Sequence, residues 1–284
     1  MDSNGRNVLE RIRELYYSLS AAEQKVARYA LENSGGVQLM SITELADAAG
    51  VSEATVTRFC RTLSLSGFAA FKLEIAKCTA HNTDKNEKSS PDSLEKRREE
   101  IAKEAKGAID STLEGIDART LTLAVDEIVK AERVLCAGMG GGLISACECA
   151  HTFLTASPKF FALPDSHMQS AAVATMSERD LLILFSYSGS TVEGTELLAL
   201  AKARGVRTLL VTRFSKSPSA QYADTVLRCG STEGPYQMGS APARIAQITV
   251  IDMLYREFAS RESERESVER NVSAVADALS AKHA

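Results

Sequence analysis

The sequence lacks the marks of a membrane or secreted protein. No apolar run approaches the roughly 18 residues that a membrane-spanning helix needs, and the polar start MDSNGRN does not look like a signal peptide. The six cysteines include no CxxC pair, which favours small buried thiols in a reducing compartment over disulfides. These absences together predict a cytoplasmic protein that has no membrane partner.

Metal ligands are also scarce. The nearest thing to a cluster is Cys147, Cys149 and His151, of which Cys147 and His151 would share one face of a helix. A structural zinc site needs further ligands, and none stands nearby. We therefore predict no metal site.

An excess of positive charge is missing too. The formal net charge of the 284 residues is −4, so the chain as a whole has no basic signature for nucleic acid. One small DNA-binding domain can nevertheless be outweighed by an acidic partner domain. A chain of this length exceeds one average domain, and two domains are the expectation.

A polar stretch divides the chain. Residues 81–93, HNTDKNEKSSPDS, contain no large apolar side chain and can bury nothing, which is typical of a linker. The periodic segments before it are helical, whereas strand-like apolar runs alternate with helical segments after it. We predict an all-α domain over 1–80 and an α/β domain with a C-terminal helical tail over 94–284.

The first domain carries the signals of a helix-turn-helix. Apolar residues from Val8 to Leu19 recur at three- and four-residue spacing, and Ser20 and Ser41 each stand three residues before a glutamate, as in a capping box. Gly50 can take a positive φ between the segments ITELADAA and SEATVTRFCRTL. Two short helices joined by such a turn are a helix-turn-helix.

Periodicity separates two faces of the second of these helices. Val56, Phe59 and Leu63 share one face and should pack inside. On a recognition helix, side chains near the amino terminus reach base edges, and flanking polar side chains reach phosphates. We assign base edges to Glu53, Ala54 and Arg58, and phosphates to Ser52, Thr55, Thr57 and Arg61. Residues 52–78 carry four basic and two acidic side chains, which favours DNA over the alternative of a helical hairpin that contacts another protein.

Five short apolar runs mark the strands of the second domain. They are VLCAG at 134–138, KFFAL at 159–163, DLLILFS at 180–186, RTLLVT at 207–212 and TVLRCG at 225–230. Helical patterns occur at 94–116, 119–131, 142–156, 166–175, 191–204 and 217–222. This alternation predicts a five-stranded parallel sheet flanked by helices, and ligands of such sheets bind beyond the carboxyl ends of the strands.

Two loops at those strand ends have unusual chemistry. GMGGG at 138–142 offers backbone amides that only glycine lets a ligand approach, and FSYSGST at 185–191 adds several hydroxyls at the start of a helix. Such donors suit a phosphate, whereas the alternative, a capped tight turn, needs fewer hydroxyls. Neither loop matches the lysine-bearing P-loop or the dinucleotide fingerprint, so we predict no nucleotide cofactor.

These motifs resemble a known family. Ser186 to Glu193, SYSGSTVE, is similar to the phosphosugar loop of sugar isomerase (SIS) domains. SITELADAAGVSEATVTRFCRTL, followed by GFAAFK at 67–72, resembles the helix-turn-helix of the RpiR family of bacterial transcriptional regulators. The order of the two domains and the closing segment RIAQITVIDMLY at 244–255 also fit, so the resemblance covers nearly the whole chain.

The resemblance implies a regulator whose SIS domain binds a phosphorylated sugar and changes the affinity for a double-stranded DNA operator, usually as a homodimer or homotetramer. It implies ligand contacts from the hydroxyls of Ser186, Ser188 and Thr191, from the backbone of Tyr187 and Gly189, and from the glycine loop Gly140, Gly141 and Gly142. The chain departs from the family at three positions. Gly142 stands where serine is usual, Ala243 where serine often precedes arginine, and Ser64 where glycine is frequent.

Three further residues are candidates for the sugar. His167 follows the second strand and either lines the ligand mouth or is a polar surface residue. Glu233 and Arg244 flank the long loop STEGPYQMGSAPA and are candidate partners of sugar hydroxyls.

Two other functions compete with a regulator. A phosphosugar isomerase would need a base that moves a proton between carbons, and only His167, Glu193 and Glu233 could serve. A sugar-phosphate sensor that contacts a protein and not DNA is the second. Because no catalytic pair is marked by spacing and the first domain has a DNA-reading pattern, we predict a regulator that is not an enzyme. Segments 94–116 and 268–279 carry apolar residues that could pack between subunits or within one.

Overall fold

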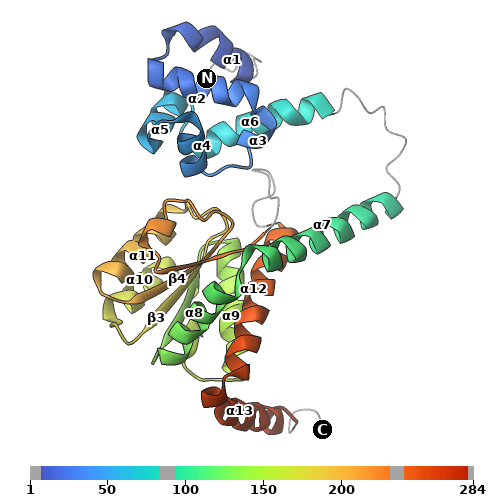
Figure 1. Cartoon of the computed structure of the whole chain (residues 1–284), viewed down its shortest axis with the longest axis vertical. Helices are drawn as coiled ribbons and strands as arrows, with labels where there is room; N and C mark the ends of the chain where they lie inside the picture. The colour runs from blue at the N-terminus through green and yellow to red at the C-terminus, as the bar shows by residue number, and fades with distance from the viewer. Residues whose placement is uncertain (1–7, 84–93, 231–239, 281–284) are drawn as a thin grey trace. The chain divides into compact units, whose positions relative to one another are not determined.

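The computed structural model describes residues 8–83, 94–230 and 240–280 (Figure 1). Packing divides them into two compact units, of which the first holds the chain up to Ala102 and the second holds the described residues from Lys103 onward. Helix α6 (Phe68–Thr83) extends into the predicted linker 81–93, and the other residues of that linker lie outside the described ranges. In these ranges, none of the helices combines the length and the apolar character that crossing a membrane requires.

The first unit is helical. Its elements are α1 (Val8–Leu15), the 3-10 turn η1 (Tyr16–Ser18), α2 (Ala21–Glu32), α3 (Ser34–Val37), α4 (Ile42–Ala49), α5 (Glu53–Thr62) and α6. The first helix is shorter than its apolar spacing suggests, since it gives way to η1 after Leu15 and the backbone becomes extended at Leu19, with ψ 148°. Leu19 is still buried at 5% exposure, which accounts for the apolar pattern. The short α3 was not predicted, since its sequence SGGV holds two glycines and has no helical period.

The predicted starts of the helices are confirmed. Ser20 and Glu23 form a full capping box at α2, and Ser41 forms another with the third residue of α4. Gly50 ends α4 with φ 63°, and Ser52 caps α5 by accepting from a backbone amide of its first turn. Helices α4 and α5 therefore form the predicted helix-turn-helix.

The inner face of α5 is also as predicted. Val56, Phe59 and Leu63 are fully buried in the core of the first unit, together with Leu45 of α4. Phe59 meets Phe71 of α6 edge to face, with 5.5 Å between ring centroids. These contacts fix which side of α5 can face outward.

The second unit contains the predicted five-stranded parallel sheet. Its strands are β1 (Val134–Gly138), β2 (Phe160–Ala162), β3 (Leu181–Phe185), β4 (Arg207–Thr212) and β5 (Thr225–Arg228), in the spatial order β2-β1-β3-β4-β5. Every neighbouring pair is parallel. The residues of β1 and β3 are buried throughout, as a parallel sheet covered on both faces requires.

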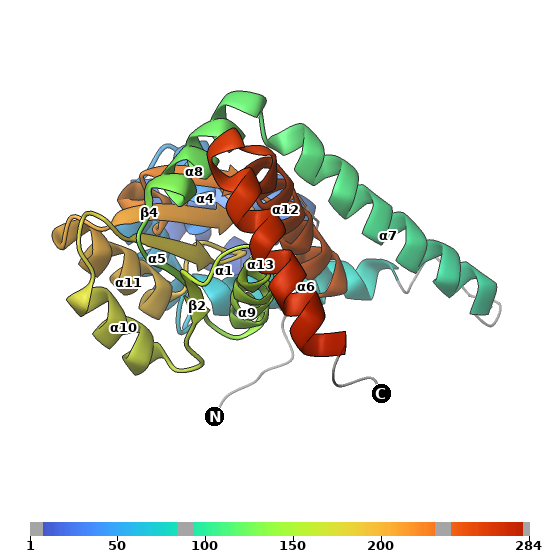
Figure 2. The same ribbon diagram turned by 90° about the horizontal axis from the view of Figure 1, so that it is seen from below.

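Helices cover both faces of this sheet (Figures 1 and 2). The covering helices are α8 (Ala118–Lys130), α9 (Gly141–Leu154), α10 (Ser166–Thr175), α11 (Val192–Ala203) and α12 (Ala241–Ser260), and the chain also forms α7 (Leu94–Gly115), which begins in the first unit, and α13 (Glu262–Ser280). Successive strand residues point to opposite faces. Cys136 and Ile183 therefore pack with α8, α9 and α12, whereas Leu135 and Leu184 pack with α10 and α11.

The segment 217–222 is not the helix that its pattern predicted. It holds only the 3-10 turn η2 (Ala220–Tyr222). The amide of Ser219 donates to the carbonyl of Gly189 at 2.9 Å, and its Oγ lies 2.8 Å from Oγ1 of Thr195. These bonds hold the segment against the loop after β3 and α11, so its backbone does not continue as a helix.

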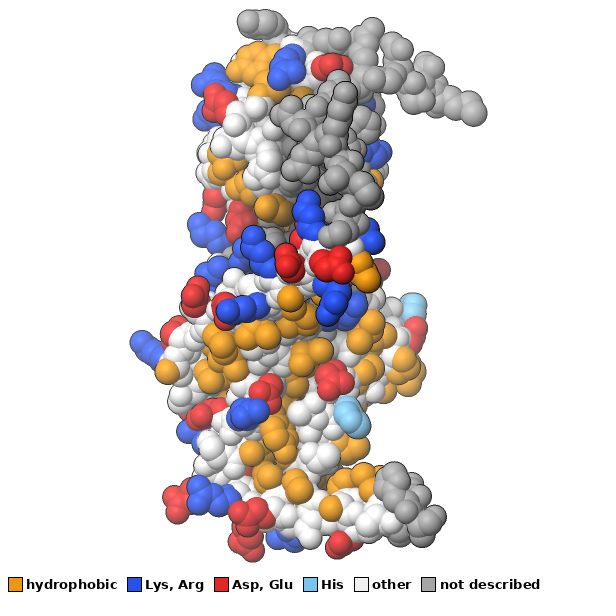
Figure 3. Space-filling view, turned by 90° about the vertical axis from the view of Figure 1, so that its right-hand side faces the viewer, with side chains coloured by type: hydrophobic (Ala, Val, Ile, Leu, Met, Phe, Trp, Pro, Cys, Tyr) orange, Lys and Arg blue, Asp and Glu red, His pale blue; other side chains and the backbone are white. Residues whose placement is uncertain are grey.

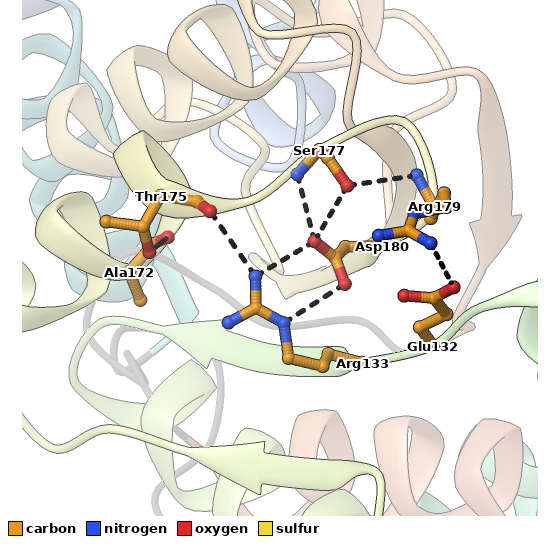
Figure 4. A network of polar contacts seen from close by, with 7 residues as sticks. All are labelled: Glu132, Arg133, Ala172, Thr175, Ser177, Arg179 and Asp180. Carbon is orange, nitrogen blue, oxygen red and sulfur yellow. Dashed lines mark hydrogen bonds and ion pairs between the residues drawn. The ribbon is translucent and has the colours of Figure 1, made fainter.

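An ion pair ties the amino-terminal ends of β1 and β3 together (Figure 4). Arg133 donates from Nε and Nη2 to the two carboxylate oxygens of Asp180, at 3.1 and 3.0 Å, and the amide of Ser177 donates to the same carboxylate at 2.9 Å. The Asp180 side chain is only 3% exposed. Burial by itself raises the pKa of Asp180, but the bonds from Arg133 and Ser177 outweigh it, so its net pKa is lowered.

We expect Asp180→Asn to lower the free energy of unfolding at pH 7 by about 1–3 kcal/mol, because it weakens a buried, charge-assisted pair. A carboxyl whose pKa is lowered in the folded state stabilises above its unfolded pKa of about 4 and loses that contribution as pH falls through the folded value. The difference between parent and variant, measured by urea unfolding, should therefore shrink below about pH 4.

Asp252→Asn is the matched control, since Asp252 pairs with Arg256 on the surface at 56% side-chain exposure. We expect it to change stability by less than about 1 kcal/mol. A stability difference for Asp180→Asn that stays constant from pH 7 to pH 3 would contradict the assigned role of its charge.

Candidate DNA-binding surface and ligand-binding site

Helix α5 presents much of the predicted DNA-binding set on its outer face. Ala54, Arg58 and Arg61 are exposed, and Ser52 is exposed in the turn before the helix. Arg58 has 62% of its side chain exposed. The amino-terminal half of α5 thus carries a small side chain next to a long basic one, which suits an approach to base edges.

Three other predicted residues are less accessible. Thr55 is buried at 8% exposure, with its Oγ1 3.0 Å from Oγ of Ser52, so it belongs to the helix cap and its predicted phosphate contact has no support in this geometry. Glu53 and Thr57 are half-buried. The carboxylate of Glu53 accepts from Oγ1 of Thr43 at 2.5 Å, which ties the start of α5 to α4.

Ser64 has an unusual backbone just after α5. Its φ of 55° is the only positive value at a non-glycine among the described residues. Glycine takes this region without the steric cost that a Cβ brings. The departure from the family's frequent glycine therefore falls at a position where the backbone itself favours glycine.

The two loops predicted to bind a phosphate lie side by side. Strand β1 pairs with β3 so that Gly138 stands opposite Phe185, the last residue of each strand. The glycine loop and the hydroxyl loop therefore leave neighbouring strands at one edge of the sheet. Strand β4 pairs with the other side of β3 and adds the segment 213–219 beside them.

The hydroxyls after β3 have different surroundings. Ser186 is buried at 7% exposure, and its Oγ has no hydrogen-bond partner among the described residues. Ser188 is exposed, and its Oγ accepts from the amide of Ser190 at 3.2 Å. Thr191 stands at the N-cap of α11, but its hydroxyl makes no cap hydrogen bond. The start of α11 thus faces a loop whose hydroxyls are only partly used.

Gly189 shapes the turn of this loop. It has φ 59°, and a Cβ there would lie 2.2 Å from Oγ of Ser217, so a side chain does not fit. Its amide donates to the carbonyl of Ser186 at 3.1 Å, and its carbonyl accepts from Ser219. The carbonyl of Tyr187 likewise accepts from the first amide after β4, at 3.0 Å. These backbone groups brace the loop against the segment after β4.

The glycine loop lets α9 begin close to β3. A Cβ on Gly142 would lie 2.2 Å from the carbonyl oxygen of Phe185. The amide of Gly142 donates to the carbonyl of Met139 at 3.0 Å, which leaves the amides of Gly140 and Gly141 at the start of the helix. Gly142 therefore serves close packing, and the usual serine would require this backbone to shift.

Gln169 joins the site, although it was not predicted from the sequence. Its Nε2 donates to the carbonyl of Gly138 at 3.1 Å and to that of Leu163 at 2.9 Å, and the residue is only 1% exposed. Nothing in the segment DSHMQS indicates this contact, because it depends on the placement of β2 beside β1. His167, two residues earlier on α10, is exposed.

The remaining candidates lie on and before α12. Arg244 is half-buried in the first turn of α12. This helix is joined to α9 by a buried hydrogen bond from Oγ of Ser145 to Oε1 of Gln247, at 2.6 Å. Arg244 therefore stands on a helix that packs beside the helix of the glycine loop. Glu233 lies outside the described residues.

Unmet hydrogen-bonding capacity collects at this edge of the sheet. Among the described residues, four buried side-chain polar atoms have no partner, and three of them belong to Gln169, Ser186 and Ser217. Buried polar atoms in folded proteins are nearly always paired. Two of these groups are hydroxyls that can donate, and the third is an amide oxygen that can accept, a set that suits a ligand with both an anionic group and hydroxyls.

The fold and the site define a two-part regulator, with a helix-turn-helix followed by a sugar-isomerase domain. The helix-turn-helix domain of the rpiR family matches residues 6–82, and the SIS domain matches residues 127–256. An HTH-type transcriptional regulator of Caldanaerobacter subterraneus is 36% identical over 251 residues, which cover 88% of this chain and 89% of that protein. The HTH-type transcriptional regulator HexR of Pseudomonas aeruginosa is 31% identical over 251 residues, which cover 88% of this chain and 88% of HexR.

A solved structure is similar over the same extent. The NanR protein of Vibrio vulnificus, complexed with ManNAc-6P, has a TM-score of 0.86 and 26% sequence identity, and the match covers 96% of this chain and 98% of that one. The chain belongs to the RpiR family of transcriptional regulators. The resemblance seen in the sequence is thereby confirmed.

Proposed function

We propose that the chain is a DNA-binding regulator of carbohydrate or related metabolism whose SIS domain binds a phosphorylated sugar. The observation that carries this proposal is the buried, unpartnered hydroxyl of Ser186 at the end of β3, beside the start of α11. A helix amino terminus favours negative charge and offers unpaired amides. The complex of NanR with ManNAc-6P supports a sugar phosphate as the class of ligand.

The phosphate would meet the hydroxyls of Ser186, Ser188 and Thr191, and the sugar would extend toward the glycine loop. His167 and Arg244 stay candidates for the sugar. A ligand changes the affinity for DNA only if it binds two states of the protein differently. The regulator therefore needs a sugar-bound state and a DNA-bound state that differ in the second unit.

We expect Arg58 and Arg61 to act differently on DNA. Arg58→Ala should flatten the preference among sequences at a cost of about 1–3 kcal/mol, because a bidentate base contact is lost. Arg61→Ala should weaken binding to all sequences alike and reduce the salt slope by about one, because a phosphate contact is lost. Anisotropy titrations with a duplex selected from a random library, and with a scrambled duplex, measure both. If both variants bind like the parent, α5 is not the recognition helix.

We expect Ser186→Ala to weaken binding of a sugar phosphate by about ten- to a hundredfold, since one donor to a charged group is lost. The free protein should lose no stability, because the hydroxyl is buried without a partner. Calorimetric titration with a panel of sugar phosphates and thermal unfolding without ligand measure the two effects.

Ser190→Ala is the matched control from the same loop, because its hydroxyl is exposed and donates to the carbonyl of Ser188 at 3.0 Å. It should keep most of the affinity. The double variant Ser186→Ala/Ser188→Ala should still bind operator DNA but should lose the response to sugar phosphate. An unchanged response in the double variant would show that the loop is only a capped turn.

We further propose that the chain is a sensor and not an isomerase. Its relatives carry the names of transcriptional regulators over nearly their whole length. Two of the residues considered as a base, His167 and Glu193, are exposed on different helices, α10 and α11. Catalysis of proton transfer needs a positioned base, and neither residue is enclosed.

We also propose a homodimer or homotetramer built on the second unit. Exposed apolar residues stand on three of its helices, with Ile109 and Leu113 on α7, Ile144 and Leu154 on α9, and Ile248 on α12. Figure 3 shows hydrophobic side chains gathered on the face of this unit that carries α7 and α12. Contiguous apolar surface of this kind marks protein interfaces.

Light scattering at micromolar concentration should therefore give a mass of at least twice 30.6 kDa. Two-fold DNA sites also call for a two-fold protein. The double variant Ile144→Glu/Ile248→Glu should shift the protein toward monomer, because it places charges on an apolar interface. A parent protein that stays at 30.6 kDa and binds a duplex only as a single copy would rule the assembly out.

A further inference from the structure

We propose that Glu23 of α2 is a positioning residue for Arg58, and that it raises the discrimination between DNA sequences more than it raises affinity. The inference rests on the proposed DNA-binding role of α5. Glu23 lies outside the helix-turn-helix itself, on the helix that packs behind it. Its contribution would be indirect, because it acts through the guanidinium of Arg58.

The two oxygens of the Glu23 carboxylate serve different helices. Oε2 accepts from the amide of Ser20 at 3.0 Å and from Oγ of Ser20 at 2.5 Å, which completes the capping box of α2. Oε1 accepts from Oγ1 of Thr62 at 2.9 Å and lies 3.7 Å from Nε of Arg58. Capping of α2 uses only Oε2. The contacts that Oε1 makes with Thr62 and Arg58 of α5 are therefore not required for the cap.

The carboxylate is held in its charged form. Burial raises the pKa of Glu23, but the bonds from Ser20 and Thr62 and the charge of Arg58 lower it further, so the net pKa is below its ordinary value. The residue is only 6% exposed. A fixed negative charge therefore stands directly behind α5 at neutral pH.

Arg58 meets this charge with one side of its guanidinium. Its Nε faces Glu23, while no hydrogen bond joins its two terminal nitrogens to any described residue. Arginine reads guanine with two nitrogens at once, and this requires a defined direction of the fork. An arginine that is free in all its rotamers loses more entropy on binding than one that is already restrained.

The same charge opposes unspecific contacts. The Glu23 carboxylate competes with DNA phosphates for the guanidinium of Arg58, and phosphate contacts supply nearly all of the affinity for sequences without base contacts. Glu23 should thus favour the bound state in which Arg58 reaches a base edge and disfavour those in which it rests on a phosphate. Both effects increase the ratio of affinities for preferred and scrambled duplexes.

Glu23→Gln tests this, because glutamine also serves in a capping box, where its single oxygen can accept from Ser20, while the charge beside Arg58 is removed. Binding is measured with a duplex that the parent selects from a random library and with a scrambled duplex of the same composition. We expect the ratio of the two affinities to fall by about two- to fivefold, the range of exposed ion-pair couplings. Glu32→Gln removes the same charge from an exposed position of α2 and should leave the ratio unchanged.

The decisive measurement repeats Glu23→Gln in an Arg58→Ala background. There it should have no further effect on the ratio, because the residue through which it acts is gone. Equal ratios for Glu23→Gln and Glu32→Gln, or an undiminished effect without Arg58, would overturn the inference. Should Glu23→Gln fail to fold by circular dichroism, Thr62→Val provides a second test, because it removes the hydrogen bond to Oε1 of Glu23. This variant must also lower the ratio of affinities for the selected and scrambled duplexes. A parent that does not prefer its selected duplex would instead refute the DNA-binding role of α5.

Discussion

The pairing of β1 with β3 is the constraint on which the candidate ligand site depends. The chain passes from β1 through α9 to β2 at the edge of the sheet, and then returns across β1 to form β3. Because the last residues of β1 and β3 stand opposite each other, two loops that are more than 40 residues apart leave the sheet side by side. Without this crossover, the glycine loop and the hydroxyl loop would be separate turns with no common ligand.

Buried polar groups are paired at one end of these strands and unpaired at the other. At their amino-terminal ends, Arg133 and Asp180 close a hydrogen-bonded pair that leaves the buried carboxylate fully occupied. At their carboxyl ends, Gln169, Ser186 and Ser217 keep buried polar atoms without partners. Each unsatisfied buried group costs about 1–3 kcal/mol, so this edge is destabilising in itself. A protein tolerates such a cost where the groups serve a ligand and other contacts hold the sheet together.

In the first unit, one buried carboxylate makes contacts with two helices. The carboxylate of Glu23 caps α2 and also contacts Thr62 and Arg58 of α5, so a single buried charge links the two helices. The core under α5 rests on apolar residues of its inner face, so the exposed side chains of Ala54, Arg58 and Arg61 on the outer face are not part of that core. The position of Arg58 is therefore decided by neighbours that lie far from it in sequence.

Local signals in the sequence were sufficient for most of the elements and for the class of protein. Serine and glutamate at capping-box spacing, Gly50 at the turn, and apolar runs of strand length predicted the helix starts and the parallel strands, because each depends on contacts within a few residues. The motif SYSGSTVE and the helix-turn-helix pattern indicated the family for the same reason.

Only the tertiary structure decided which partners meet across the fold. The strand order brings Gln169 to Gly138, the segment after β4 braces Gly189 in place of the predicted helix, and Glu23 reaches Arg58. These contacts join residues that are 28 or more positions apart, and no periodicity or cap in a single segment encodes them.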